Sequence, residues 1–164
     1  MTFATTDLCD DHPGLLENGC LAVVPLQLRH FGTHMRFCGR ATTLKVFEDN
    51  ALVRATLEAP GNGNVLVIDG GGSMRRALVG GQLGVLAQNN GWAGIVVYGC
   101  VRDTDELNAC AIGVRALGVH PQKSSKKGEG ERNGRVHFGG VPVSPGDWVY
   151  ADADGVLIAQ QKLG

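Results

Sequence analysis

Apolar residues along this chain gather in short runs that glycine-rich turns separate, a pattern that predicts an α/β protein of short elements. The clearest run covers residues 94–98, where four consecutive β-formers without alternation predict a strand buried on both faces. Gly99 predicts the end of that strand. Arg102 and Asp103 would then follow its carboxyl end, where open α/β sheets usually bind their ligands.

A second buried run at residues 65–68 and a helical pattern from Gly80 to Asn89 precede this strand. The resulting strand–helix–strand order predicts that the two strands are parallel neighbours. Further short strands and helices are expected, with the first helix ending near Pro13 and another at 51–59 capped by Asp49 and Asn50. The remaining predicted elements are strands at 20–24, 40–47 and 112–116, a helix at 105–109, and antiparallel strands at 135–138, 141–143, 148–150 and 156–159.

The length and composition of the chain predict a single globular domain that covers residues 1–164. The chain is 43% apolar and 19% charged, and its 25 glycines are spread throughout, which favours many tight turns over a helical bundle. A net charge of −1 gives no general attraction to nucleic acid or to anionic membranes. Five scattered cysteines without metal-ligand spacing indicate a reduced, cytoplasmic protein, and no apolar run is long enough to span a membrane.

The two glycines that open the predicted helix at residues 80–89 are a candidate binding feature. A dinucleotide fingerprint from Gly70 fails at Arg75, and no phosphate-binding Gly-Lys-Ser/Thr triplet occurs. Gly80 and Gly81 would leave the first amides of the helix uncovered, which favours a carboxylate or phosphate site. The alternative is that these glycines only permit close packing of the helix. Sequence order places this helix start at the same sheet edge as Arg102 and Asp103.

Other polar residues have simpler interpretations. Asp103 and Glu106 fit a helix capping box as well as a metal site. His30 and His34 have metal-ligand spacing, but the intervening glycine disfavours a helix and no acidic ligand is near. Residues 123–132 predict a solvated loop, since interleaved acids and the lack of aromatic residues disfavour RNA binding. Asp152 and Asp154 are interpreted as turn residues because the rest of a calcium loop is missing.

Several of these segments together resemble the RraA-like family, which groups the regulator of ribonuclease E activity A with class II 4-hydroxy-4-methyl-2-oxoglutarate aldolases. The resemblance rests on residues 67–78, Gly81 and residues 102–106, and segments 38–50 and 138–155 extend it over nearly the whole chain. It implies an α/β fold of the swivelling β/β/α type, with a mixed sheet and a C-terminal antiparallel β portion. It also implies a homotrimer with sites between subunits, and a divalent metal, Mg²⁺ or Mn²⁺.

The resemblance also implies roles for individual residues. Asp103 would be the metal ligand, and Arg102 would bind the substrate and act in catalysis beside it. Glu106 stays open between helix support and a second acid behind the metal ligand. Aldol cleavage to pyruvate must stabilise an enolate, which a hard cation and an arginine can do. The implied substrate-binding amide loop consists of Gly80, Gly81, Gln82 and Leu83.

The family contains two kinds of function, and one position separates them. The family's aldolases carry an aspartate where this chain has Gly81, and a glycine there is the pattern of the regulators. The metal-binding aspartate of the family is nevertheless retained here, as Asp103. The resemblance therefore implies a metal-dependent lyase that cleaves 4-hydroxy-4-methyl-2-oxoglutarate to pyruvate and decarboxylates oxaloacetate through the same enolate. The alternative is a non-enzymatic regulator that binds and inhibits ribonuclease E. The partners implied are a small 2-oxo acid, further copies of the chain, and the nuclease, with no direct nucleic acid and no membrane.

Overall fold

A mixed ten-stranded sheet forms the centre of the molecule in the computed structural model, which describes residues 2–164. Its strand order is β1-β12-β11-β3-β4-β6-β7-β2, with β5 beside β6 and β8 beside β3, and β9 and β10 form a separate pair. The strands are β1 (Leu21–Val23), β2 (Arg29–Phe31), β3 (Phe37–Lys45), β4 (Val65–Asp69), β5 (Ala77–Val79), β6 (Gly94–Val101), β7 (Gly113–Val119), β8 (Glu131–Arg132), β9 (Val136–Phe138), β10 (Val141–Val143), β11 (Trp148–Ala151) and β12 (Val156–Ala159).

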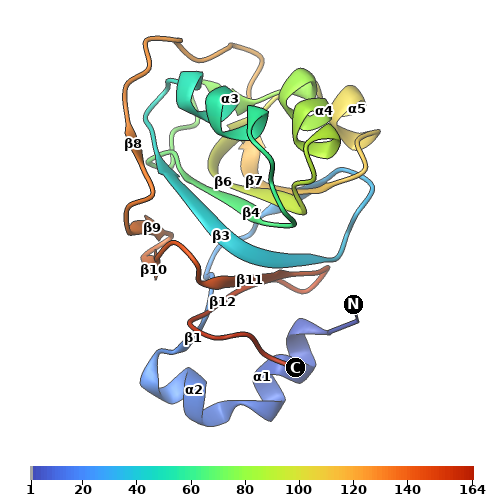
Figure 1. Cartoon of the computed structure of the whole chain (residues 1–164), viewed down its shortest axis with the longest axis vertical. Helices are drawn as coiled ribbons and strands as arrows, with labels where there is room; N and C mark the ends of the chain where they lie inside the picture. The colour runs from blue at the N-terminus through green and yellow to red at the C-terminus, as the bar shows by residue number, and fades with distance from the viewer. Residues whose placement is uncertain (1) are drawn as a thin grey trace.

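Helices lie on two sides of this sheet. In Figure 1, α3 (Ala51–Glu58), α4 (Gly81–Asn89) and α5 (Thr104–Asn108) cover the upper face of the parallel strands, while β11, β12 and β1 lie beneath them. The N-terminal helices α1 (Thr5–Asp11) and α2 (Pro13–Asn18) form the lower end of the molecule, near both chain termini. No helix within residues 2–164 is long and apolar enough to cross a membrane.

The uninterrupted apolar runs of the sequence are the strands buried on both faces, as predicted. On β6, Ile95 and Val97 pack into a core under the helices, whereas Val96 packs into a second core against the antiparallel strands. All three side chains are buried, and β4 and β6 are parallel neighbours in register from Val65 opposite Gly94. The strand–helix–strand prediction is therefore confirmed.

The long strand β3 joins the two halves of the fold. Its first part, Phe37 to Arg40, pairs antiparallel with β11, and its second part, Ala41 to Lys45, pairs parallel with β4. β11 also pairs antiparallel with β12, and β9 with β10. The mixed sheet and the C-terminal antiparallel portion are both present, which confirms the predicted fold class.

One local prediction is wrong because a distant contact decides the structure, and two others are confirmed but incomplete. β6 does not stop at Gly99 but continues to Val101, because β5 pairs with its last residues at Cys100 and Val101. The first helix, α1, ends at Asp11, near Pro13 as predicted, and Pro13 itself begins α2, since the first helical position needs no amide hydrogen. Asp152 does hold a turn, accepting from the Asp154 amide at 2.9 Å, but it is also buried and accepts two hydrogen bonds from Thr5 at 2.7 Å.

Candidate functional site

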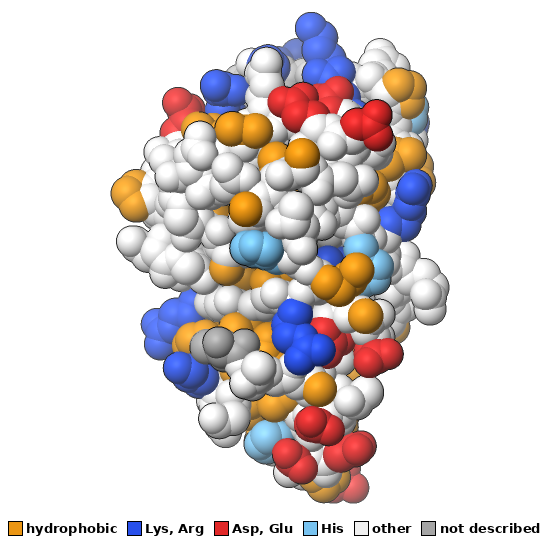
Figure 2. Space-filling view, turned by 90° about the vertical axis from the view of Figure 1, so that its right-hand side faces the viewer, with side chains coloured by type: hydrophobic (Ala, Val, Ile, Leu, Met, Phe, Trp, Pro, Cys, Tyr) orange, Lys and Arg blue, Asp and Glu red, His pale blue; other side chains and the backbone are white. Residues whose placement is uncertain are grey.

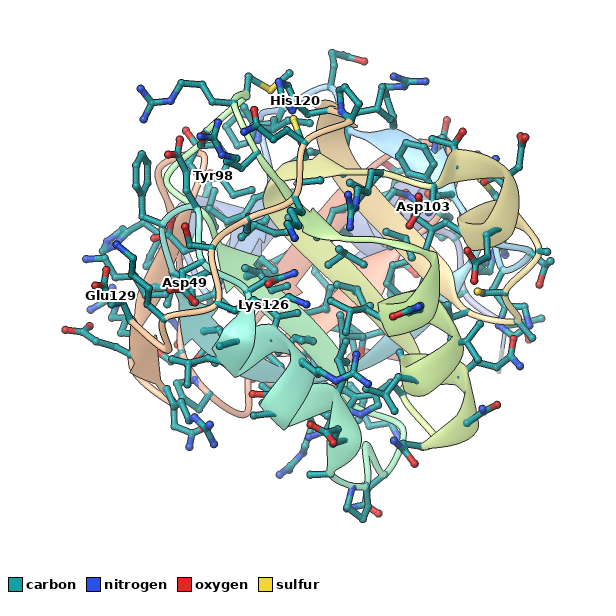
Figure 3. The ribbon with its side chains drawn as sticks, turned by 90° about the horizontal axis from the view of Figure 1, so that it is seen from above. Asp49, Tyr98, Asp103, His120, Lys126 and Glu129 are labelled. Carbon is teal, nitrogen blue, oxygen red and sulfur yellow. The ribbon has the colours of Figure 1, made fainter. Side chains whose placement is uncertain are left out.

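A cleft of about 320 Å³ lies beyond the carboxyl ends of β5 and β6. It is the place where parallel strands end and the following loops are free of the sheet's hydrogen bonds. Figure 3 shows Asp103 and Lys126, two residues that line the cleft from separate segments of the chain. The lining residues are Asn50, Ala51, Arg54, Ala77, Gly80, Gln82, Leu83, Arg102, Asp103, Glu106, Lys123 and Lys126.

Asp103 directs its carboxylate toward α4 and not along its own helix. It occupies the N-cap position of α5 with left-handed backbone angles (φ 55°, ψ 52°), and its side chain makes no capping hydrogen bond. Its Oδ2 instead accepts from the amide of Gly81 at 3.1 Å. Left-handed geometry is tolerated by aspartate at modest cost, and here it points the carboxylate at the cleft. The predicted capping box is therefore wrong in its hydrogen bonding, although Asp103 stands at the helix start.

The two glycines at the start of α4 serve both purposes that the sequence left open. A Cβ on Gly80 would lie 2.7 Å from Asp103 Oδ2, and a Cβ on Gly81 would lie 2.3 Å from the Glu106 carboxylate, so a side chain at either position would have to displace a carboxylate. At the same time the first turn of a helix has amides without intrahelical acceptors. Asp103 takes the amide of Gly81. The amides of Gln82 and Leu83 remain as donors beside the cleft.

Arg102 reaches the cleft from the position directly after β6, which ends at Val101. Its backbone amide donates to the Val79 carbonyl at 2.9 Å, which fixes the start of its side chain. Its guanidinium makes one long hydrogen bond, to the Pro121 carbonyl at 3.4 Å. Among residues 2–164 one ion pair is present, between Arg75 and Glu48 at 2.8 Å. Arg102 therefore has no carboxylate partner in this part of the chain. Its charge is available to an anionic ligand.

A segment that the sequence indicated as a solvated loop supplies two more cations. Lys123 and Lys126 line the cleft from residues 122–128, which we call the lysine strap. The side chains of the strap are exposed except for Ser124, whose hydroxyl donates to the Ala77 carbonyl at 2.8 Å. The prediction of an exposed loop is confirmed, but the strap is anchored across the site.

Asp49 is the main anchor of the lysine strap. It is 2% exposed, and its carboxylate accepts the amides of Lys127 at 2.8 Å, Gly128 at 3.2 Å and Ala51 at 3.1 Å. Burial raises the pKa of Asp49, but the hydrogen bonds from the backbone amides outweigh burial, so this pKa lies below its ordinary value. The Ala51 bond is the helix cap predicted for Asp49; the two bonds to the strap were not predictable from local sequence.

The donor set of the cleft fits a divalent cation held by one protein carboxylate. Asp103 is exposed, and its Oδ1 makes no hydrogen bond within residues 2–164, so one oxygen is available as a ligand. Mg²⁺ commonly takes one or two carboxylates and keeps several waters, so such a site needs no cluster of protein ligands. No group of three His, Cys, Asp or Glu that could hold a metal occurs in the described part of the chain. His30 and His34 accordingly form no such group.

The structure brings together every residue that the sequence assigned to the site. Gly80, Gln82, Leu83, Arg102, Asp103 and Glu106 line one cleft, and Gly81 lies directly behind it. Sequence reasoning missed Asn50, Arg54, Lys123 and Lys126. Charged side chains of both signs gather at the upper end of the face in Figure 2, the end at which α4 and α5 lie in Figure 1.

Known proteins resemble this chain along nearly its whole length. Residues 5–158 match the RraA-like family model, described as Aldolase/RraA. The chain is 61% identical over 160 residues to a Cupriavidus necator protein named "Putative 4-hydroxy-4-methyl-2-oxoglutarate aldolase", covering 98% of this chain and 97% of that one. A Burkholderia multivorans protein of the same name is 60% identical over 163 residues, with 99% of each chain covered.

Solved structures share the fold under two further names. The RNA-processing inhibitor RraA from Thermus thermophilis superposes with a TM-score of 0.92 at 47% identity, covering 100% of this chain and 96% of that chain. A Geobacillus kaustophilus protein described as an S-adenosylmethionine:2-dimethylmenaquinone methyltransferase gives a TM-score of 0.92 at 45% identity, with 98% and 97% covered. One architecture thus carries three different functional names, so the choice among them has to come from the site.

Proposed function

Because this chain belongs to the RraA-like family, we propose that it is a divalent-metal-dependent lyase acting on 2-oxo dicarboxylates. Its reactions would be cleavage of 4-hydroxy-4-methyl-2-oxoglutarate to pyruvate and decarboxylation of oxaloacetate. The observation that carries the proposal is the meeting of Arg102, Asp103 and the first amides of α4 in one cleft. Relatives about 60% identical bear the aldolase name, which supports the same choice.

Both reactions break a carbon–carbon bond next to C3 of the substrate and leave the electron pair as a pyruvate enolate. In the aldol cleavage the C4 hydroxyl gives its proton to a water molecule and becomes the carbonyl of a second pyruvate, and the enolate then takes a proton at C3 to become the first. In the decarboxylation the distal carboxylate leaves as CO₂. The barrier in each case is the negative charge that develops on the keto oxygen, so positive groups fixed near that oxygen accelerate both reactions.

The chain's own residues supply fixed positive groups of this kind. The Arg102 guanidinium can donate two parallel hydrogen bonds to the carboxylate beside the keto group or to the enolate oxygen. The amides of Gln82 and Leu83, at the positive end of α4, can donate to the same carboxylate. Asp103 would hold Mg²⁺ or Mn²⁺, which supplies Lewis-acid stabilisation of the enolate oxygen when bound. Glu106 packs against Gly81 and so positions the amides that follow it.

Pyruvate release tests this proposal. The protein is incubated with each substrate and Mg²⁺, and pyruvate is followed against a metal-only reaction, because free metal decarboxylates oxaloacetate slowly. We expect turnover that a chelator abolishes and added Mg²⁺ restores. Turnover no faster than the metal-only reaction, with both substrates, would refute the lyase.

A second candidate function is regulation of ribonuclease E by direct binding. It is favoured by the 47% identity to the Thermus RNA-processing inhibitor and by Gly81 at the position where the family's aldolases carry an acid. A pull-down with ribonuclease E and an RNA-cleavage assay test it together. Absence of both association and slowed cleavage would contradict the regulator, and the outcome is independent of the pyruvate assay.

A further inference from the structure

The cleft contains more positive charge than the reacting end of a 2-oxo acid requires. Four cations line it, Arg54, Arg102, Lys123 and Lys126, against the two carboxylates of Asp103 and Glu106. The proposed function uses Arg102, Asp103 and the α4 amides at the keto end. Arg54, on α3, and Lys123 and Lys126, on the lysine strap, are left over, and none of the three forms an ion pair within residues 2–164.

The lysines stand on a segment whose backbone is held in several places. The Ala77 amide donates to the Gln122 carbonyl at 2.8 Å, the Asn50 amide to the Ser125 carbonyl at 3.0 Å, and the Ser125 amide to the Glu48 carbonyl at 2.9 Å. Asp49 adds its two bonds to Lys127 and Gly128. A solvated loop needs no such anchors. These anchors hold at the cleft the segment that carries Lys123 and Lys126.

We propose that Lys126, with Lys123 beside it, binds the second carboxylate of the substrate and thereby selects 2-oxo dicarboxylates over 2-oxo monocarboxylates. This inference rests on the proposed function, because it assumes that Arg102 and the α4 amides hold the keto end. The distal carboxylate then lies on the strap side of the cleft. A charge-assisted hydrogen bond there favours the dianion by about tenfold over a substrate that lacks the group.

Asn50 adds a second polar group on the strap side. Its Nδ2 donates to the Leu78 carbonyl at 3.3 Å, while its Oδ1 is buried without a hydrogen-bond partner in residues 2–164. Buried acceptors are rarely left unpaired, but this oxygen has no exposed surface, so a ligand in the cleft can donate to it only after the Asn50 side chain turns.

The test compares a dicarboxylate reaction with a monocarboxylate reaction that passes through the same enolate. Oxaloacetate decarboxylation is measured by steady-state kinetics, and exchange of the pyruvate methyl protons with D₂O is measured by NMR. We expect Lys126→Met to raise KM for oxaloacetate about tenfold without lowering kcat, because the distal carboxylate loses its charge as it leaves as CO₂. Pyruvate exchange should fall by less than about twofold, because pyruvate has no distal carboxylate. Lys123→Met should act in the same direction, and the double variant more strongly.

Lys127→Met is the matched control. It removes the same charge from the same segment, but its side chain does not line the cleft, so KM for oxaloacetate should stay within about twofold of the wild type. Thermal melting of each variant separates binding effects from unfolding. An unchanged KM in the double variant would overturn the inference, as would a fall in pyruvate exchange parallel to the loss with oxaloacetate.

A binding measurement keeps the inference separate from the proposed lyase. If the wild type neither cleaves 4-hydroxy-4-methyl-2-oxoglutarate nor decarboxylates oxaloacetate, the proposed lyase function is refuted. Calorimetry with 2-oxoglutarate and 2-oxobutyrate then still tests whether the strap lysines bind a second carboxylate. We expect the wild type to bind the dicarboxylate about tenfold more tightly, and Lys126→Met to lose this preference. Equal affinities in the wild type would overturn the role of the lysine strap.

Discussion

Asp49 and Asp103 occupy similar places in the chain, and their carboxylates do opposite things. Each follows a strand of the sheet and precedes a helix. Asp49 is 2% exposed and accepts amides from its own helix and from the lysine strap. Asp103 is exposed, does not cap its own helix, and accepts a single amide, that of Gly81.

The difference lies in how many donors surround each carboxylate. A buried acid is stable only when its oxygens are paired, and pairing commits them to structure. Asp49 therefore links α3 to the lysine strap through hydrogen bonds to both. Asp103 keeps an oxygen without a partner in the described chain, which is what a ligand or a cation needs. One residue type in one local setting thus has two roles, and tertiary contacts decide between them.

The largest effect expected from this comparison is the loss of activity in Asp103→Asn. Turnover should fall on the order of 10³-fold, because an amide binds a hard cation far more weakly than a carboxylate does. The free energy of unfolding should change by no more than about 0.5 kcal/mol, since the side chain is exposed. Pyruvate release and urea unfolding measure the two quantities. Unchanged turnover in a folded variant would remove Asp103 from the site.

Asp49→Asn should show the reverse pattern. The free energy of unfolding should fall by about 2 kcal/mol, because the Asn amide nitrogen cannot accept hydrogen bonds and leaves strap or helix amides unpaired. KM for oxaloacetate should rise as the strap loosens, with kcat less affected. Asp147→Asn is the control: Asp147 accepts one turn amide, that of Ser144 at 2.8 Å, and lies outside the cleft. A stable Asp49→Asn protein with normal KM would show that the strap is held by other contacts.

Much of the candidate site could be predicted from local sequence, because its signals are local. A buried strand followed by Arg102 and Asp103, and a helix begun by two glycines, were sufficient to place the cleft at one sheet edge. The end of β6 was predicted wrongly, since β5 pairing extends the strand past Gly99. Lys126 was missed because its position depends on Asp49, which contacts Lys127 across 78 residues of sequence. No pattern around the lysines indicates that contact.

A smaller effect is expected at Gly81, whose amide donates to Asp103 and whose α-carbon lies beside the Glu106 carboxylate. Gly81→Ala places a Cβ 2.3 Å from the Glu106 carboxylate and must displace it. Turnover should fall about tenfold because the α4 amides shift with it, while Glu106→Ala in the same chain should relieve part of the loss. Gly14→Ala, where an added Cβ meets no atom within 4 Å, is the control. Purely additive losses in the double variant would show that Gly81 and Glu106 act independently.

The smallest effect concerns pH and follows from the direction of one pKa shift. Burial raises the pKa of Asp49, but its amide hydrogen bonds lower this pKa by more than burial raises it, so the folded protein holds the proton more weakly than the unfolded chain does. The stabilisation by Asp49 is therefore complete above the unfolded pKa of about 3.9 and is lost as pH falls through the folded value. We expect the difference in unfolding free energy between the wild type and Asp49→Asn to be constant from pH 7 to about pH 5 and to shrink below about pH 4. Other carboxylates titrate in both proteins and cancel in the difference. A gap that widens toward acid would mean that Asp49 is protonated in the folded state, and that its contacts with the strap are those of a neutral acid.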